Sequence, residues 1–166
     1  MKKLLLFSVI MIAFTAVTFA QDVTEQTTAT ATILAPLSMT KVSDMDFGTI
    51  AVTGTAGTVV LGTDNSRLAT GPALVPPAAG VAASFTVNGE NGRAFTITLP
   101  ANGVVTLVNG GNSMAANDFV HNAGGTPALD GTGAAAFTVG ATLSVGAAQA
   151  AGTYTSANFP VTINYN

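Results

Sequence analysis

The chain contains no cysteine and no tryptophan, and it has one histidine and only five lysine and arginine residues among 166. Without cysteine there is no disulfide, no thiolate metal site and no cysteine nucleophile. The few cations are scattered and form no basic patch, so nucleic acid and anionic membranes are not expected partners. Instead, 48% of the residues are hydrophobic and 18 are glycine. This apolar excess predicts an ordered domain rather than a disordered chain.

The first twenty residues have the layout of a secretory signal peptide. Lys2 and Lys3 precede a mostly apolar run over residues 4–19, and Ala20 offers a small residue for cleavage. The run is shorter than a membrane-spanning helix needs, which leaves an uncleaved anchor as the alternative. We therefore expect secretion to the cell surface, with no membrane insertion after cleavage. Loss of the two lysines takes the formal net charge from −3 to −5.

Apolar and polar residues alternate along much of the remaining chain, and this period of two is typical of strands with one buried face. Residues 21–28 are polar and are expected to form a flexible leader, followed by one domain over residues 29–166. With about eight to ten short strands separated by glycine-rich turns, the pattern predicts an all-β, antiparallel β-sandwich. The predicted strands cover residues 29–39, 47–52, 58–62, 81–88, 94–99, 104–108, 114–120, 137–145 and 159–166.

Two local features sharpen this expectation. The turn at residues 89–92 contains Asn91-Gly92, which predicts a hairpin between the strands on either side. Residues 63–80 contain three prolines, so a central strand is not expected there, and the stretch is interpreted as turns.

No catalytic, cofactor-binding or metal-binding residues are predicted. His121 lies in a glycine- and asparagine-rich stretch, without the serine elbow of a hydrolase, and is interpreted as a solvent-facing loop residue. Asp44 and Asp46 are close in sequence but are interpreted as turn-forming and solubilising charges rather than a glycosidase pair. Tyr154 and Tyr165 are interpreted as core residues rather than sugar-stacking platforms.

Three stretches resemble a known family: ATATILAPLSMTKVSDMDFGTI from residue 29, ASFTVNGENGRAFTITLP from residue 83, and AFTVGATLSVGAAQAAGTYTSANFPVTINYN from residue 136. Together they are similar to the bacterial secreted family called domain of unknown function 4402. A weaker similarity is to the spore-coat-U-like subunits of archaic chaperone–usher pili. It is carried by the alternating residues 29–39, by Phe47-Gly48, and by the stretch from Gly152-Thr153-Tyr154 to Tyr165.

The pilin resemblance implies an immunoglobulin-like sandwich that lacks one strand, which the N-terminal segment of the next subunit supplies. The candidate donor residues are Ile33, Leu37 and Met39, and the candidate groove-edge strand carries Phe159, Val161, Ile163 and Tyr165. An open sheet edge is a template for another chain, and burying each large donor side chain contributes about 1.5–3 kcal/mol before ordering costs. Such a head-to-tail contact propagates into fibres.

Three hypotheses follow from the sequence. The first is a secreted, non-enzymatic subunit of a surface appendage that assembles with itself or other pilin-like subunits, with a periplasmic chaperone and usher as further partners. The second is a self-contained adhesive or carbohydrate-binding module in which residues 29–39 form the domain's own first strand. The third, a secreted enzyme, has the least support.

Overall fold

The computed structural model describes residues 21–76 and 79–166, and the predicted signal peptide lies outside this part. The chain divides into two units, Met1–Thr32 and Ile33–Asn166. In the first unit, residues 21–32 are exposed and have no regular secondary structure. The second unit contains twelve strands, several of them only two residues long. Among the described residues there is no helix, so none is present that could cross a bilayer.

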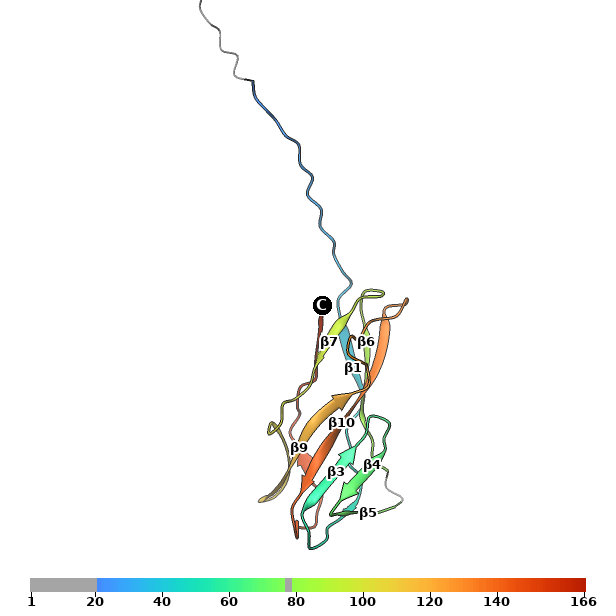
Figure 1. Cartoon of the computed structure of the whole chain (residues 1–166), viewed down its shortest axis with the longest axis vertical. Coiled ribbons are helices and arrows are strands. Elements are labelled where there is room, and N and C mark those ends of the chain that lie inside the picture. Colours follow the sequence, from blue (N-terminus) through green and yellow to red (C-terminus); the bar gives the residue numbers. More distant parts are fainter. Residues whose placement is uncertain (1–20, 77–78) are drawn as a thin grey trace, which may run out of the picture. The chain divides into compact units, whose positions relative to one another are not determined.

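The all-β prediction is confirmed, and all strand pairings are antiparallel. A large sheet has the order β1-β6-β10-β9-β8-β11, with β3 and β4 attached through β10, and two small sheets pair β12 with β7 and β2 with β5. The strands are β1 Ser38–Ser43, β2 Ile50–Ala51, β3 Gly57–Leu61, β4 Arg67–Thr70, β5 Ala73–Leu74, β6 Ala83–Asn88, β7 Phe95–Thr98, β8 Val105–Asn109, β9 Asn112–His121, β10 Ala134–Val145, β11 Thr155–Ser156 and β12 Thr162–Tyr165 (Figure 1).

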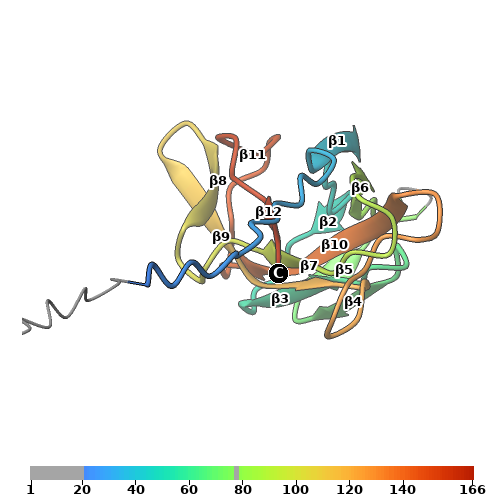
Figure 2. The ribbon, with the colours of Figure 1, turned by 90° about the horizontal axis from the view of Figure 1, so that it is seen from above.

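Strand β10 lies at the centre of the large sheet. Val139 pairs with residues of both β6 and β9, and Leu143 pairs with residues of both β3 and β9. Strands β6 and β3 therefore follow each other along one edge of β10, and β9 occupies the other edge. Viewed along the strands, the sheet curls so that its end strands β1 and β11 lie on the same side (Figure 2).

The buried face of β10 shows why this strand forms. The alternating apolar residues that the sequence singled out are all buried, and their hydroxyl-bearing neighbours are less so, as expected of a pleated strand. These buried residues are Phe137, Val139, Ala141, Leu143 and Val145. The first two belong to a cluster with residues of β6, β7 and β12, whereas the last three belong to a second cluster with residues of β3, β8 and β9.

The predicted hairpin between residues 81–88 and 94–99 is wrong. Gly92 has φ +68° and Arg93 N–H donates to Glu90 C=O at 3.2 Å, so the turn exists. However, β6 pairs with β1 and β10, whereas β7 pairs with β12. Both strands carry an apolar face, and these faces pack in one cluster instead of lying in one sheet. The turn signal specified a chain reversal, but burial of two apolar faces placed its strands in different layers.

Two further predictions need correction. Residues 63–80 were expected to be turns, but they contain the short strands β4 and β5. Neither is central, because β4 pairs only with β3 and β5 only with β2, which is consistent with the prolines nearby. The first strand was predicted over residues 29–39, whereas β1 runs over Ser38–Ser43. Pro36 cannot donate to a ladder, and pairing with β6 begins only after it, at Ser38.

Two turns are closed by aspartate side chains. A carboxylate oxygen of Asp64 accepts from the hydroxyl and the N–H of Ser66, and Asp130 accepts in the same way from Thr132 and also from Ala134 N–H at 3.0 Å. In each case the hydroxyl bond, followed by the backbone bonds, holds the pKa of the carboxyl below its usual value. Both turns therefore favour the ionised aspartate.

We predict that protonation of Asp64 and Asp130 lowers the thermal stability of the domain at low pH. Their pKa is lower in the folded than in the unfolded chain, so the stabilisation is complete above the unfolded value of about 3.9 and is lost as pH falls through the folded value. A D64N/D130N variant should have a lower Tm than the wild type at pH 7 and a flatter Tm profile below pH about 4. The matched control D22N/E25Q removes two charges from residues 21–32. An equally flat profile for this control would contradict the assignment.

We also predict that Gly140→Ala destabilises the fold. A Cβ at Gly140 would lie 2.3 Å from Leu61 O and 3.0 Å from the Gly62 carbonyl carbon, which are backbone atoms that cannot rotate away. Crowding of this kind costs about 1–3 kcal/mol. The control Gly125→Ala meets no atom within 4 Å and should leave the free energy of unfolding, measured by urea titration, nearly unchanged.

Candidate functional site

The domain has an open groove of about 1040 Å³, which both polar and apolar residues line. One wall is the segment 44–52, the other is the segment 149–159, and the floor is the face of β8, β9 and β10. Thus the inner face of the large sheet lacks a covering strand here. The Val, Leu, Ile, Met and Phe residues of the lining are Met45, Phe47, Ile50, Val52, Phe85, Val105, Leu107, Met114, Phe119, Leu143, Val145, Phe159 and Val161.

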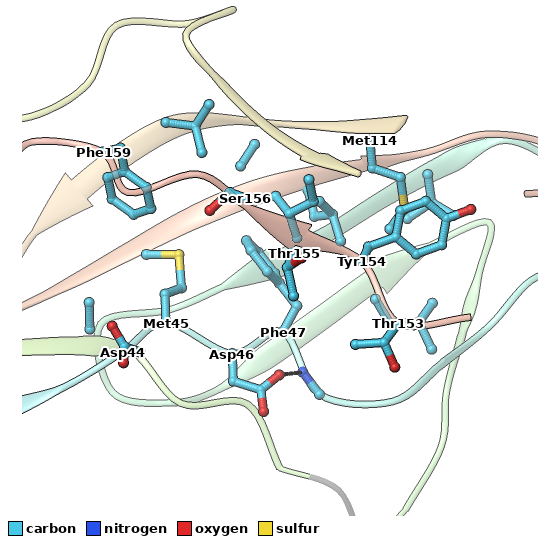
Figure 3. Close-up of a pocket in the computed structure, with 18 of the residues that line it drawn as sticks. Asp44, Met45, Asp46, Phe47, Met114, Thr153, Tyr154, Thr155, Ser156 and Phe159 are labelled. Atoms are coloured by element: carbon cyan, nitrogen blue, oxygen red, sulfur yellow. Dashed lines mark hydrogen bonds between the residues drawn. The ribbon is translucent and has the colours of Figure 1, made fainter. Parts of the chain in front are cut away.

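The first wall is held by contacts on its outer side. Asp46 exchanges two backbone hydrogen bonds with Val81, both 2.8 Å, and a carboxylate oxygen of Asp46 accepts from Gly48 N–H at 2.7 Å (Figure 3). Arg67 donates through Nη1 to the carbonyl oxygens of Phe47 and Thr49, at 2.8 and 3.2 Å. These bonds hold an otherwise irregular segment at the edge of the groove. Phe47 is thereby buried against the core.

The second wall is paired only in part. Within it, β11 pairs with Val108 and Leu107 of β8, and the preceding turn is locked by Gln149 Nε2 donating to the Tyr154 hydroxyl at 2.9 Å. Within the described part of the chain, residues 157–161 make no backbone hydrogen bond. Apart from Pro160, which has no N–H, the residues of this stretch therefore offer N–H and C=O groups to another strand.

The strand that follows has one open edge. The Asn166 N–H donates to Ala94 C=O, so the even-numbered residues of β12 make the ladder with β7. The odd-numbered residues, Ile163 and Tyr165, consequently direct their backbone groups to the opposite edge. No strand pairs with that edge among the residues that the structure describes. Strand β1, at one end of the large sheet, is likewise paired only with β6.

The predicted groove-edge residues divide between the two clusters. Phe159 and Val161 line the groove, and Phe159 points into it from the second wall opposite Met45 (Figure 3). Val161, Ile163 and Tyr165 pack against the cluster around β6 and β7. Of these four residues, Ile163 and Tyr165 lie in the paired strand β12, whereas Phe159 and Val161 lie in the irregular stretch before it.

The predicted donor residues are not equivalent. Leu37 and Met39 are half-buried against the core of their own domain, and Met39 pairs with Val87. Ile33 is 94% exposed. Within the described part of the chain, residues 21–34 make no hydrogen bond. Only the stretch before Ala35 is therefore available to another chain without dismantling β1.

The residues considered for chemistry are not assembled into a site. His121 is the last residue of β9, not a loop residue as predicted. Its ring is edge-on to that of Phe137, with the two ring centroids 6.3 Å apart. Asp44 forms an exposed ion pair with Lys41. Tyr154 is half-buried at the groove wall, where its hydroxyl donates to Ala150 C=O at 2.8 Å. Among the described residues, no three His, Asp or Glu side chains converge as a metal site would require.

A sequence model of the family described as "Domain of unknown function (DUF4402)" matches residues 37–165. The chain belongs to this family. The DUF4402 match runs from the residue before β1 to the last residue of β12, so it covers the groove but not residues 21–36. The predicted membership is confirmed. No curated protein and no solved structure matches the chain.

We predict that Arg67→Met loosens the first groove wall of this DUF4402 domain. The variant removes the donors to Phe47 and Thr49, and hydrogen bonds from a charged group contribute about 1.5–3 kcal/mol. Amide exchange of residues 46–50 should accelerate by about 10- to 100-fold. The control Arg93→Met removes the same charge from an exposed side chain. Equal acceleration in both variants would show that net charge, not these bonds, holds the wall.

Proposed function

We propose that this protein is a secreted, non-enzymatic structural subunit of a bacterial surface appendage, assembled by β-strand complementation. The observation that carries the proposal is the open groove between the segments 44–52 and 149–159, with the apolar face of the large sheet as its floor. Most side chains of the floor are already buried, but Met114, Phe119 and Phe159 are only half-buried and would lose more contact with water under an added strand. Apolar surface left open in this way marks interaction sites. An added strand covers the floor with its side chains and pairs with the walls through its backbone.

The second wall is suited to receive such a strand. Residues 157–161 have backbone groups without protein partners in the described part of the chain, and they adjoin the open edge of β12. A small sugar would use polar groups at the rim but would leave most of the floor uncovered. A peptide strand of four to six residues would cover the floor with its side chains and pair with the backbone groups of the second wall, as an edge-strand addition does.

The donor in this proposal is the stretch before Ala35. Val23, Ala29, Ala31 and Ile33 share one parity, so they lie on one face of an extended strand, with Thr28, Thr30 and Thr32 on the other. The described residues of this stretch are exposed apart from Leu34. Ile33 is the single large anchor, and its burial contributes about 1.5–3 kcal/mol.

The donor segment and the groove are different parts of the chain, so a contact between them in two copies is heterologous, repeats head to tail and produces fibres. The partner is accordingly a second copy of this chain or another subunit of the same kind. Before assembly, an open groove with unpaired backbone groups also associates non-specifically with other chains. The proposal therefore includes a periplasmic chaperone and an usher among the partners. Export through the N-terminal segment and display at the cell surface complete the proposal.

The test compares the chain beginning at Gln21 with two charge variants. Ile33→Asp places a carboxylate on the apolar face of the donor, whereas Thr32→Asp places it on the opposite face. Size-exclusion chromatography and negative-stain microscopy should show regular fibres for the wild type and Thr32→Asp, and monomers for Ile33→Asp. Fibres formed equally by all three would indicate non-specific aggregation and contradict the proposal.

A peptide covering residues 21–34 provides the complementary measurement. Added to the Ile33→Asp monomer, it should raise Tm and protect the amides of residues 157–161 from exchange. The result would instead favour a self-contained adhesive or carbohydrate-binding module if the wild type is a stable monomer that does not bind this peptide and whose Tm rises when a glycan is added.

A further inference from the structure

The residue at which the N-terminal segment joins the domain is held on both sides of its backbone. Ala35 N–H donates to Glu90 Oε2 at 3.0 Å, and Ala35 C=O accepts from the Tyr165 hydroxyl at 2.9 Å. The same hydroxyl accepts from the Glu90 N–H at 2.6 Å. We call Ala35, Glu90 and Tyr165 the clasp. Its three members come from the start, the middle and the end of the domain.

The clasp rests on a well-fixed part of the fold. Gly89 N–H donates to Gly133 C=O at 2.9 Å and Gly92 N–H donates to Asp130 C=O at 3.1 Å, so the loop carrying Glu90 is tied to the Asp130 turn. A Cβ at Gly89 would lie 2.2 Å from the Tyr165 hydroxyl. Glycine at this position therefore permits the close approach of the tyrosine.

Pro36 adds a second restraint at the same point. The proline ring fixes its own φ and disfavours the helical region for Ala35, so this pair stays extended. The chain then enters β1, and the groove lining begins only at Lys41 and the segment 44–52. For the preceding residues to occupy the groove of their own domain, the chain would have to reverse direction next to β1. Both restraints oppose a reversal at Ala35, so the turn would have to fall in the residues before it, which include Ile33.

We propose that the clasp and Pro36 direct the donor segment to the groove of a second copy by preventing it from folding back into its own. This inference rests on the proposed function. An intramolecular donor competes with an intermolecular one at a high effective concentration, so a chain carrying both donor and groove polymerises only when self-filling is hindered. Glu90 and Tyr165 act here as positioning residues, since they contact Ala35 and do not line the groove.

The test uses the full chain from Gln21 with Tyr165→Phe and Pro36→Gly combined. Tyr165→Phe keeps the ring that packs against the core and removes only the hydroxyl. The control, Thr96→Val with Pro100→Gly, removes a hydroxyl bonded to Asn166 in the same small sheet and a proline away from Ala35. Glu90→Ala with Pro36→Gly is a second clasp variant, in case the first folds poorly.

Two readouts separate the outcomes: the monomer fraction by light scattering, and amide exchange of residues 23–33 within that monomer. The clasp variants should show at least a fivefold larger monomer fraction, with these amides protected and the protection independent of dilution. The wild type and the control should form fibres and leave a small monomer fraction with unprotected amides.

Other results overturn the inference in distinguishable ways. Clasp variants that polymerise like the wild type refute the role of the clasp while leaving strand complementation intact. Protected amides in a wild-type monomer show that the segment fills its own groove despite the clasp. A wild-type monomer with unprotected amides that binds no 21–34 peptide removes the proposed function, and the inference falls with it.

Discussion

The fold depends on covering one apolar face of one strand. Strand β10 presents five buried side chains on a single side, and a curled sheet of neighbours extends that face on both edges. Over the first half of β10, the small sheet of β7 and β12, together with Leu129, supplies the cover. Over the second half, Phe47 and Phe159 provide partial cover, and the groove lies between the segments that carry them. The incomplete second layer is therefore where a partner strand would contribute most.

The local composition explains why this side of the domain stays open. The second layer there is built from the segments 44–52 and 149–159, whose only strands, β2 and β11, have two residues each. Glycine, alanine and threonine dominate segment 149–159, which buries little apolar area of its own, whereas segment 44–52 buries Phe47. Met45 and Phe119 contact both clusters and link the covered half of the core to the open half. An added strand would thus be expected to stabilise the whole domain rather than the groove alone.

Much of the fold was predictable because period-two alternation reports burial directly. The buried face of β10 and the all-β class followed from residue parity alone. The strand with which each predicted strand pairs could not be predicted. Asn91-Gly92 specifies a reversal but not whether its arms share a sheet, and parity over residues 29–39 continues across Pro36 although the ladder does not. Strand partners are set by non-local packing, which a local pattern does not contain.

The candidate site was predictable only in part, for the same reason. The alternation of Phe159 and Val161 predicted a strand, and their place at the edge of a groove came only from the resemblance to pilin subunits. Leu37 and Met39 looked like donors because they share parity with Ile33, yet their own domain holds them half-buried. The clasp left no sequence signal, since a glutamate in a turn and a terminal tyrosine have many ordinary roles. Yet the clasp holds the backbone at Ala35, just before the first strand of the domain. Ile33 lies before this point, and its large apolar side chain is exposed in the described part of the chain.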